Sequence, residues 1–217
     1  MSHELFALLA ESLQQTLIMV SVALAIATAL GVPLGVILNA AAPGQLLPNA
    51  PVYRVLGAIV NATRSTPFII LMVALIPLTR IIVGTSIGTP AAVVPLTIAA
   101  TPFIARIVEA ALRDVDRGLV EAAQAMGATP WQIVVKVLLP ESLPATVAGL
   151  TLAAVAMIGY SAMAGAVGGG GLGDLAIRYG YERFRADVMA ATVAILIALV
   201  QLVQSGGDAL ARRLKHT

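Results

Sequence analysis

The sequence predicts an all-α fold, a polytopic membrane helix bundle of five transmembrane helices in a single domain over residues 1–217. Of the 217 residues, 59% are hydrophobic and only 11% are charged, whereas soluble domains carry about 25% charged residues. The mean hydropathy is +0.95. A soluble fold of this length cannot bury so much apolar surface, but a bilayer accepts it because the bilayer core is itself apolar.

Charge-free stretches place the expected spans. A hydrocarbon core about 30 Å thick requires about 20 residues of helix, and no charged residue lies between Glu11 and Arg54. Proline and glycine in Asn39–Tyr53 indicate a loop after the first span. Arg64 and Arg80 are expected near the two ends of the second span, with side chains that reach the headgroups. The spans are expected at about 12–38, 60–83, 90–112, 143–167 and 187–208.

Small residues in the first span favour close packing against another helix. Gly31 and Gly35 form a G-x-x-x-G pattern, and Ala27 lies one turn earlier on the same face. Prolines also lie inside the expected spans, at Pro33, Pro67, Pro77, Pro95 and Pro102. They are tolerated there because neighbouring helices and local adjustments satisfy the freed backbone groups.

The distribution of lysine and arginine predicts the orientation, because cytoplasmic segments carry the excess of basic residues. One side holds nine of them: Arg54, Arg64, Arg106, Arg113, Arg117, Lys136, Arg212, Arg213 and Lys215. The other side holds four: Arg80, Arg178, Arg183 and Arg185. We therefore expect the N-terminus outside and the C-terminus in the cytoplasm. The first residues carry no basic n-region, so the first apolar stretch is expected to be retained as a span and not removed as a signal peptide.

The residue types present argue against several classes of site. Cysteine is absent, which excludes disulfides and cysteine metal sites. His3 and His216 lie near opposite ends of the chain, which argues against a histidine zinc site. Lys136 and Lys215, the two lysines, do not follow a glycine, so no P-loop is present to bind nucleotide phosphates. The scattered basic residues form no stripe for nucleic acid, and we expect no catalytic residue, metal or cofactor in this chain.

The polar segment 113–141 between the third and fourth spans predicts two short helices. An apolar stripe at helical spacing defines the first: Leu119, Ala122, Ala123 and Met126. Glu121 lies on a neighbouring, more polar face, and Gly127 predicts the end of the helix because glycine adopts the left-handed conformation without penalty. Thr129–Gln132 (Thr-Pro-Trp-Gln) then predicts a second helix, with threonine as N-cap, proline in the first turn and glutamine completing a capping box.

Two interpretations of this segment are possible. The first short helix lies flat on the lipid headgroups, or it presents a shallow alanine face on which another protein docks. Alanines anchor poorly in lipid and the stripe is narrow, so the sequence favours a docking site.

The same segment resembles the signature loop of the membrane subunits of bacterial ABC importers, Glu-Ala-Ala-x₃-Gly-x₉-Ile-x-Leu-Pro. This chain matches the signature at Glu121, Ala122, Ala123, Gly127, Leu139 and Pro140, and it has Val137 where the family usually has isoleucine. The resemblance implies the type I ABC importer permease fold. It also implies that Glu121, Ala122, Ala123 and Gly127 belong to a cytoplasmic coupling helix seated in a groove of an ATPase subunit.

Further stretches resemble the permease subunits of the methionine uptake transporter family. They are Arg64–Leu71, Ile76–Gly88, Pro102–Arg106, Met126–Pro130 and Gly159–Gly173, and the resemblance covers almost the whole chain. It implies a homodimer in the bacterial inner membrane, two ATPase subunits that bind ATP and Mg²⁺, and an external methionine-binding lipoprotein. The implied function is the inward transport of L- and D-methionine by alternating access, with ATP hydrolysis carried out by the ATPase subunits and not by this chain.

The translocation path is expected near the end of the fourth span, at Tyr160, Ser161 and Met163, just before the glycine-rich run Gly165–Gly173. A methionine side chain is adaptable and polarizable, so Met163 is a candidate for an apolar gate; ordinary core packing is the alternative. Outside the membrane, Leu172–Asp187 combines aromatic residues with arginine. That composition fits docking of a binding protein and equally fits anchoring in the headgroups.

Two rival functions remain open from the sequence. The first is an ABC importer for another small amino acid or nutrient. The second is a structural or channel-type membrane protein that works without an energy source.

Overall fold

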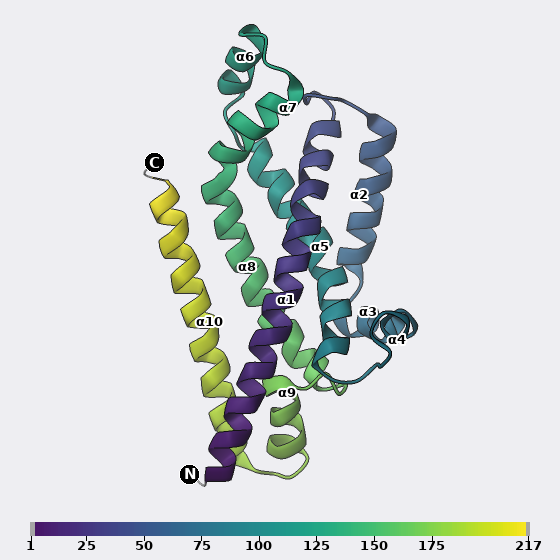
Figure 1. Cartoon of the computed structure of the whole chain (residues 1–217), viewed down its shortest axis with the longest axis vertical. Helices are drawn as coiled ribbons and strands as arrows, with labels where there is room; N and C mark the ends of the chain where they lie inside the picture. The colour runs from purple at the N-terminus through teal and green to yellow at the C-terminus, as the bar shows by residue number, and fades with distance from the viewer. Residues whose placement is uncertain (1–2, 216–217) are drawn as a thin grey trace.

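Two long helices, α1 (His3–Ala41) and α5 (Thr89–Arg113), lie side by side at the centre of the bundle (Figure 1). The computed structural model describes residues 3–215, which are helical apart from short connections and contain no strand. Helix α8 (Leu139–Gly165) packs on α5, and α10 (Ala186–Leu214) packs on α8 at the edge of the bundle. Each long helix therefore has at least one long neighbour on which to bury a face.

Small residues bring α1 and α5 into close contact. Ala27 is fully buried on the face that α1 presents to α5. A Cβ atom added at Gly31 would lie 2.9 Å from the carbonyl oxygen of Thr101, and one at Gly35 would lie 2.6 Å from the carbonyl oxygen of Ala105. The close packing expected of the G-x-x-x-G pattern is confirmed, because no side chain fits between these backbones.

The second expected span, 60–83, is not one straight helix. The chain forms α2 (Ala50–Ser65), α3 (Phe68–Ala74) and α4 (Ile76–Val83), and it bends by 105° between α2 and α3. Thr66, which precedes Pro67, adopts an extended conformation with φ −84° and ψ 124°, as expected for a residue whose helical conformation is disfavoured by the following proline. The connection is therefore a sharp corner at Pro67.

Helix α2 begins earlier than expected, inside the stretch Asn39–Tyr53 that the sequence predicts as a loop. The Asn49 side chain caps it by accepting a hydrogen bond of 3.1 Å from the Val52 amide, and Pro51 occupies the first turn, where its missing N–H costs nothing. Helix α1 likewise runs on to Ala41. The loop is thus reduced to about residues 42–49.

The position of Arg64 differs from the sequence prediction as a result. Arg54 lies near the start of α2, at the end of the bundle that also carries α6, and Arg64 follows ten residues later on the same helix. Ten residues of helix span about 15 Å. Arg64 therefore does not share a membrane surface with Arg54. It does not belong with the other eight basic residues that the sequence predicts on the cytoplasmic side.

The remaining long helices begin and end close to the expected residues. Helix α5 covers Thr89–Arg113, α8 ends at Gly165, and α10 starts at Ala186 and extends to Leu214. Short elements α7 (Pro130–Ile133) and η1 (Val134–Leu138, a π-helix) precede α8 without a break, so a continuous helix covers Pro130–Gly165. Among the described residues, four helices are long and apolar enough to cross a membrane, or five when the bent pair α2 and α3 counts as one span.

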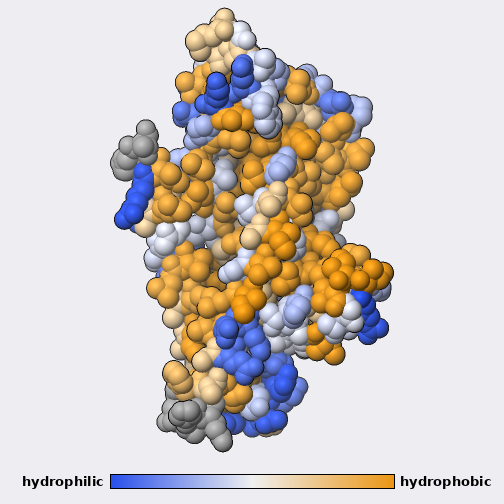
Figure 2. All heavy atoms as spheres, viewed as in Figure 1, coloured by the Kyte–Doolittle hydropathy of each residue, from blue (hydrophilic) through white to orange (hydrophobic). Residues whose placement is uncertain are grey.

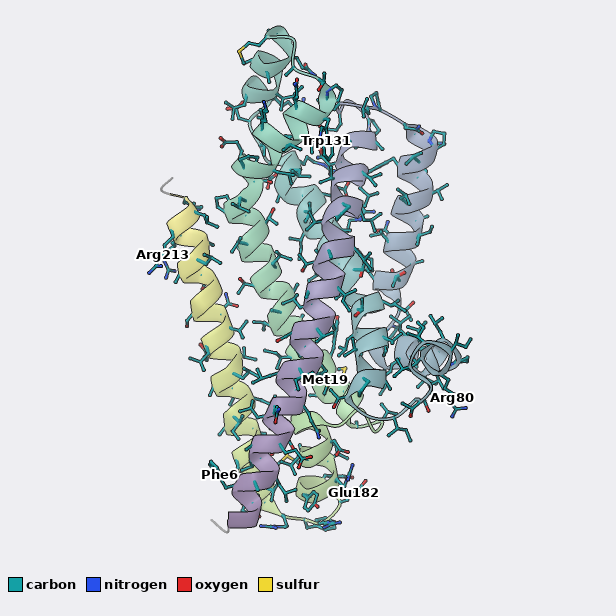
Figure 3. All side chains as sticks on the ribbon, viewed as in Figure 1. Phe6, Met19, Arg80, Trp131, Glu182 and Arg213 are labelled. Carbon is teal, nitrogen blue, oxygen red and sulfur yellow. The ribbon has the colours of Figure 1, made fainter. Side chains whose placement is uncertain are left out.

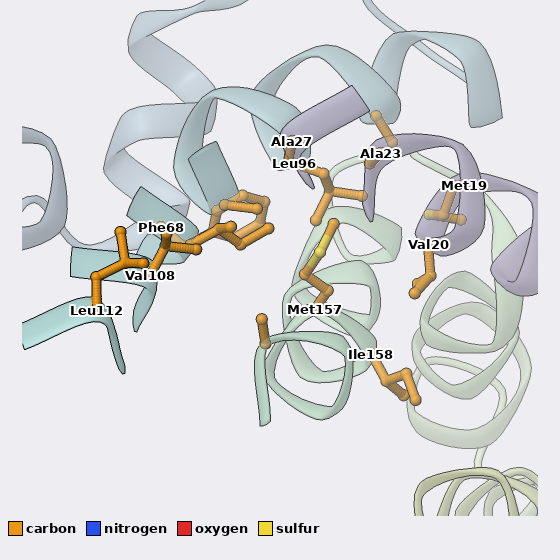
Figure 4. Close-up of a cluster of buried hydrophobic side chains, with 14 of the residues drawn as sticks. Met19, Val20, Ala23, Ala27, Phe68, Leu96, Val108, Leu112, Met157 and Ile158 are labelled. Carbon is orange, nitrogen blue, oxygen red and sulfur yellow. The ribbon is translucent and has the colours of Figure 1, made fainter. Parts of the chain in front are cut away.

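A single large cluster of buried side chains joins α1, α5 and α8. Met19, Leu96 and Met157, drawn in Figure 4, are each at most 1% exposed. The outer faces of the helices are apolar as well, with Ile197 and Leu202 of α10 58% and 72% exposed, and hydrophobic side chains cover much of the surface in Figure 2. Apolar residues both inside and outside are typical of a bundle whose surrounding solvent is lipid.

A buried carboxylate holds α2 against α5. Glu109 of α5 is 2% exposed, and its two oxygens accept hydrogen bonds from the guanidinium groups of Arg106 and Arg113. The hydroxyl of Tyr53 on α2 donates to the same carboxylate at 3.3 Å. Arg106 also donates to the Asn61 amide oxygen of α2 at 3.0 Å. The charge of Glu109 is thus compensated on both of its oxygens.

The substitution Gly35→Val should destabilise the fold because it forces the α1 and α5 backbones apart. Overpacking of a filled contact costs about 1–3 kcal/mol, so the purified protein in detergent should unfold at a lower temperature. Gly206→Val is the matched control, because a Cβ at Gly206 of α10 meets no atom within 4 Å. Equal unfolding temperatures for the two variants would contradict the close contact.

Removal of the buried carboxylate by Glu109→Ala should lower the stability of the fold more than Gly35→Val does. The change leaves the Arg106 guanidinium, 21% exposed, without its partner, and loss of one member of a buried ion pair costs about 3–5 kcal/mol. Arg113 is 50% exposed, so Arg113→Ala should cost less than about 1 kcal/mol. Thermal unfolding in detergent measures both, and the reverse order of severity would show that Glu109 is not the centre of this network.

Candidate functional site

Helix α6 (Arg117–Ala125) stands beyond the ends of α1 and α2 at one end of the bundle (Figure 1). Asp116 caps its start, since its Oδ1 atom accepts a hydrogen bond of 2.7 Å from the Gly118 amide. Ala123 is 5% exposed and belongs to the same buried cluster as the centre of the bundle. The helix is therefore an outward projection that is nevertheless packed on the membrane domain.

The end of α6 is fixed by a left-handed glycine. Gly127 has φ +79°. Its amide donates to the Gln124 carbonyl at 2.9 Å, and the Ala128 amide donates to the Ala123 carbonyl at 3.0 Å. These two bonds form a Schellman motif, which satisfies carbonyls that the helix end would otherwise leave unpaired. The predicted stop at Gly127 is confirmed.

A capping box starts the next helix immediately afterwards. The Thr129 amide donates to the Gln132 side-chain oxygen at 2.9 Å, and the Gln132 amide donates to the Thr129 hydroxyl at 3.4 Å. Pro130 occupies the first turn of α7. The predicted capping box is thus confirmed, and only four residues, 126–129, separate α6 from the continuous helix that enters the membrane.

The apolar stripe predicted on α6 is divided between two surfaces. Ala123 faces the bundle, whereas Leu119 is 44% exposed, Met126 is 82% exposed and Ala122 is also exposed. Trp131 of α7, labelled in Figure 3, is 72% exposed at the same end. Exposed tryptophan and methionine side chains at one end of the molecule, with small residues nearby in the chain, suit contact with a protein partner. From the sequence, Trp131 is predicted only as part of the helix start Thr129–Gln132; the large apolar side chain in a polar segment is the signal of its exposure to a partner.

Glu121 lies exposed on α6, on the rim of a hollow between α6 and the α1–α2 connection. Gln45 and Gln124 line the same hollow, together with Arg113 and Arg117. Within residues 3–215, Glu121 makes no ion pair. Its carboxylate is therefore available to a basic group of a partner.

The structure does not bring Tyr160, Ser161 and Met163 onto one surface. The Tyr160 ring stacks on Phe68 of α3, with ring centroids 4.7 Å apart. Ser161 is 2% exposed and its hydroxyl donates to the Ile158 carbonyl at 2.7 Å, so in this conformation it lines no open path. Met163 is 48% exposed. The three residues are adjacent on a helix, and helical rotation directs Ser161 into the core.

The glycine-rich run after α8 is tightly packed against α1. Gly171 donates its amide to the Gln15 side-chain oxygen at 2.8 Å, and Leu172 donates to the Thr16 hydroxyl at 2.9 Å. A Cβ at Gly173 would lie 2.3 Å from the Ala162 carbonyl oxygen. Glycine is required here because the backbones approach so closely.

The segment that begins at Gly171, within this run, forms the end of the molecule opposite α6 (Figure 1). It consists of α9 (Gly171–Leu175) and η2 (Ala176–Tyr181, a π-helix). The Asp174 carboxylate accepts hydrogen bonds from Arg178 and raises the pKa of that guanidinium. Tyr181 and Phe184 are 68% and 89% exposed. Aromatic side chains of this segment are therefore exposed. Exposure is required both for docking of a binding protein and for anchoring in the lipid headgroups.

Metal binding finds no support in the part of the chain that the structure describes. No group of three or more His, Asp or Glu side chains there is placed to hold an ion. His216, one of the two histidines considered in the sequence, lies outside the described residues.

Comparison with known proteins assigns this arrangement to a family. The model of the family described as "Binding-protein-dependent transport system inner membrane component" matches residues 31–216. The probable D-methionine transport system permease protein MetI of Vibrio cholerae is 59% identical over 209 residues, 96% of this chain and 93% of that protein. The D-methionine transport system permease protein MetI of Escherichia coli K12 is 52% identical over 165 residues, 76% of each protein.

A solved structure agrees with these sequence matches. A chain from inward-facing conformations of the MetNI methionine ABC transporter is 51% identical, with a TM-score of 0.97 and coverage of 99% of both chains. A likeness of this extent includes α6 and its flanking turns as well as the membrane helices. The protein has the type I ABC importer permease fold and belongs to the family of binding-protein-dependent transport system inner membrane components.

Proposed function

We propose that this chain is the membrane-spanning permease subunit of an ATP-driven importer that carries L- and D-methionine across the bacterial inner membrane. The observation that carries the proposal is the agreement in sequence and shape with the chain of a methionine ABC transporter over 99% of both chains. Relatives named as D-methionine permeases support the same substrate.

Two copies of the chain work with two ATPase subunits. The exposed surface of α6, with Leu119 and Met126, and the neighbouring Trp131 dock in a groove of the ATPase, and Glu121 pairs with a basic residue there. Ala122 leaves room for the partner to approach, and Gly127 fixes the geometry. ATP and Mg²⁺ are bound by the ATPase subunit, which also hydrolyses the ATP, so this chain is not itself an enzyme.

The end that carries α6 faces the cytoplasm, with the N-terminus outside and the C-terminus inside. Arg54, Arg113 and Arg117 lie at the α6 end of the bundle, whereas Arg80 and Arg178 lie toward the opposite end. The excess of basic residues at the α6 end supports this orientation. An external methionine-binding lipoprotein delivers the substrate to the opposite end, beside the exposed aromatic residues of the segment after α9.

Transport proceeds by alternating access. A shift between inward-open and outward-open states from 1:99 to 99:1 requires about 5.5 kcal/mol of differential binding, which ATP binding and hydrolysis in the partner supply. A rigid link is needed to transmit it, and α6 provides one because both of its ends continue into packed helices. Met163, exposed near the outer end of α8, closes the path as an adaptable apolar gate.

Uptake of labelled methionine in a methionine auxotroph that lacks its own importer tests the proposal. Cells that express the chain with its ATPase and binding protein should accumulate both enantiomers. Glu121→Lys and Gly127→Val should insert normally but lower uptake at least about tenfold, since each disturbs a contact worth about 1–2 kcal/mol.

Gly84→Val is the matched control for the glycine variant. Gly84 has φ +81°, nearly that of Gly127, and a Cβ there also meets no atom within 4 Å, but it lies at the end of α4 and away from α6. Normal uptake by Gly127→Val, or equal losses in Gly84→Val and Gly127→Val, would contradict the coupling role. Uptake of another small amino acid in place of methionine would favour the rival importer, and absence of a bound ATPase would favour a channel.

A further inference from the structure

Arg64 is an exposed charged residue on a helix of the membrane domain. It is the penultimate residue of α2, about 15 Å along the helix axis from Arg54, and α2 lies against α1 and α5. A charge within the membrane is costly, and such residues pair with another group or mark a substrate pathway. Arg64 is therefore expected to pair with an anionic group or to lie on the substrate pathway.

The described chain supplies no anionic partner. Among residues 3–215, no carboxylate forms an ion pair with Arg64, and the buried carboxylate of Glu109 is already shared by Arg106 and Arg113. The guanidinium of Arg64 lies over the Phe103 ring at 5.9 Å from its centroid. A cation–π contact of this length compensates only part of the charge.

An open hollow with a cavity volume of about 170 Å³ lies beside Arg64. The hollow is open to the outside, so a bound molecule need not be enclosed by this chain alone. Aromatic and aliphatic side chains from three helices make its walls: Phe68 and Leu71 of α3, Ala99 and Phe103 of α5, and Tyr160 of α8. Thr63, Arg64 and Thr66, at the end of α2, complete the lining.

The polar side chains around the hollow do not compensate the positive charge of Arg64. The Thr63 hydroxyl donates to the Ile59 carbonyl at 3.0 Å and the Thr66 hydroxyl donates to the Ala62 carbonyl at 3.1 Å. Both hydroxyls are thus engaged with the helix backbone. Arg64 remains the one charged group in the lining, opposite a stacked pair of rings, Phe68 on Tyr160.

The corner at Pro67 creates this arrangement. Because the chain bends by 105° after α2, α3 crosses the end of α2 and brings Phe68 next to Tyr160. The bend thus places Phe68 beside the exposed Arg64 at the rim of the hollow.

We propose that this hollow is a binding station for the transported amino acid, with the α-carboxylate on Arg64 and the side chain against Phe68, Phe103 and Tyr160. A guanidinium binds a carboxylate through two parallel hydrogen bonds, and a thioether makes favourable contacts with aromatic rings. The inference rests on the proposed function only in taking an amino acid as the ligand. It adds a recognition site within the permease itself.

Photolabelling of the complete transporter in proteoliposomes tests the site. The probe is a diazirine analogue of methionine that retains the α-carboxylate, and labelled peptides are mapped by mass spectrometry. Peptides that contain residues 63–71, 99–103 or 160 should be labelled, and methionine should compete. Methioninamide, which lacks the carboxylate, should compete at least about tenfold more weakly, because a hydrogen bond to a charged group contributes about 1.5–3 kcal/mol.

Three variants separate recognition from structure. Arg64→Gln should lower labelling and methionine uptake at least about tenfold while the purified complex keeps its size and its unfolding temperature. Arg64→Lys keeps the charge but loses the two parallel hydrogen bonds of a guanidinium. Its labelling and its methionine uptake should lie between those of Arg64→Gln and the wild type. Arg80→Gln is the control, because Arg80 is also exposed but lies on α4 and donates to Ser86; it should label as the wild type does.

Several results would overturn the site. Equal labelling of Arg64→Gln and wild type would exclude a role in binding the carboxylate, and so would labelling confined to other peptides. Dissociation of Arg64→Gln into single copies would show that Arg64 pairs with a second copy of the chain. A wild-type transporter that takes up no methionine would refute the proposed function instead, and the uptake measured on the same vesicles distinguishes the two failures.

Discussion

Helix α6 is tied at both ends to helices that pass directly into the membrane core, and the rest of the structure is arranged around this constraint. Helix α5 ends at Arg113 and α6 starts at Arg117, while the continuous helix toward α8 starts at Pro130. Ala123 of α6 and Ile133 of α7 belong to the same buried cluster as the middle of the bundle. A force applied to α6 therefore displaces α5 and α8 together, since packed interiors transmit displacement and do not absorb it.

The bundle resists such a force because its helices are held by shape and not by hydrophobic exclusion from water. Lipid is as apolar as the helices themselves, so close packing has to supply the stability. The contact of Gly31 and Gly35 with the α5 backbone and the fit of Gly173 against α8 are both closer than a side chain permits. Glu109 fixes α2 in addition, through the arginines of α5 and Tyr53. Within residues 3–215, by contrast, the guanidinium of Arg64 has no carboxylate partner and lies over the Phe103 ring.

Local features were predictable from the sequence, and tertiary ones were not. The Gly127 stop and the capping box of Thr129 depend only on neighbouring residues, so their geometry follows from residue type. The corner at Pro67 was missed because proline is tolerated in many membrane helices, and only the surrounding helices decide whether the chain bends there. Likewise, helical spacing placed Ala123 and Met126 on one stripe, although only the packing shows that Ala123 faces inward and Met126 outward.

The absence of cysteine permits a direct test of whether α6 is the cytoplasmic docking element. A single cysteine introduced by Met126→Cys, at a position that is 82% exposed, is treated with a membrane-impermeant maleimide in intact spheroplasts and in inverted vesicles. The account predicts labelling in inverted vesicles only, and protection of that cysteine when the ATPase subunit is bound. Labelling in intact spheroplasts would contradict it.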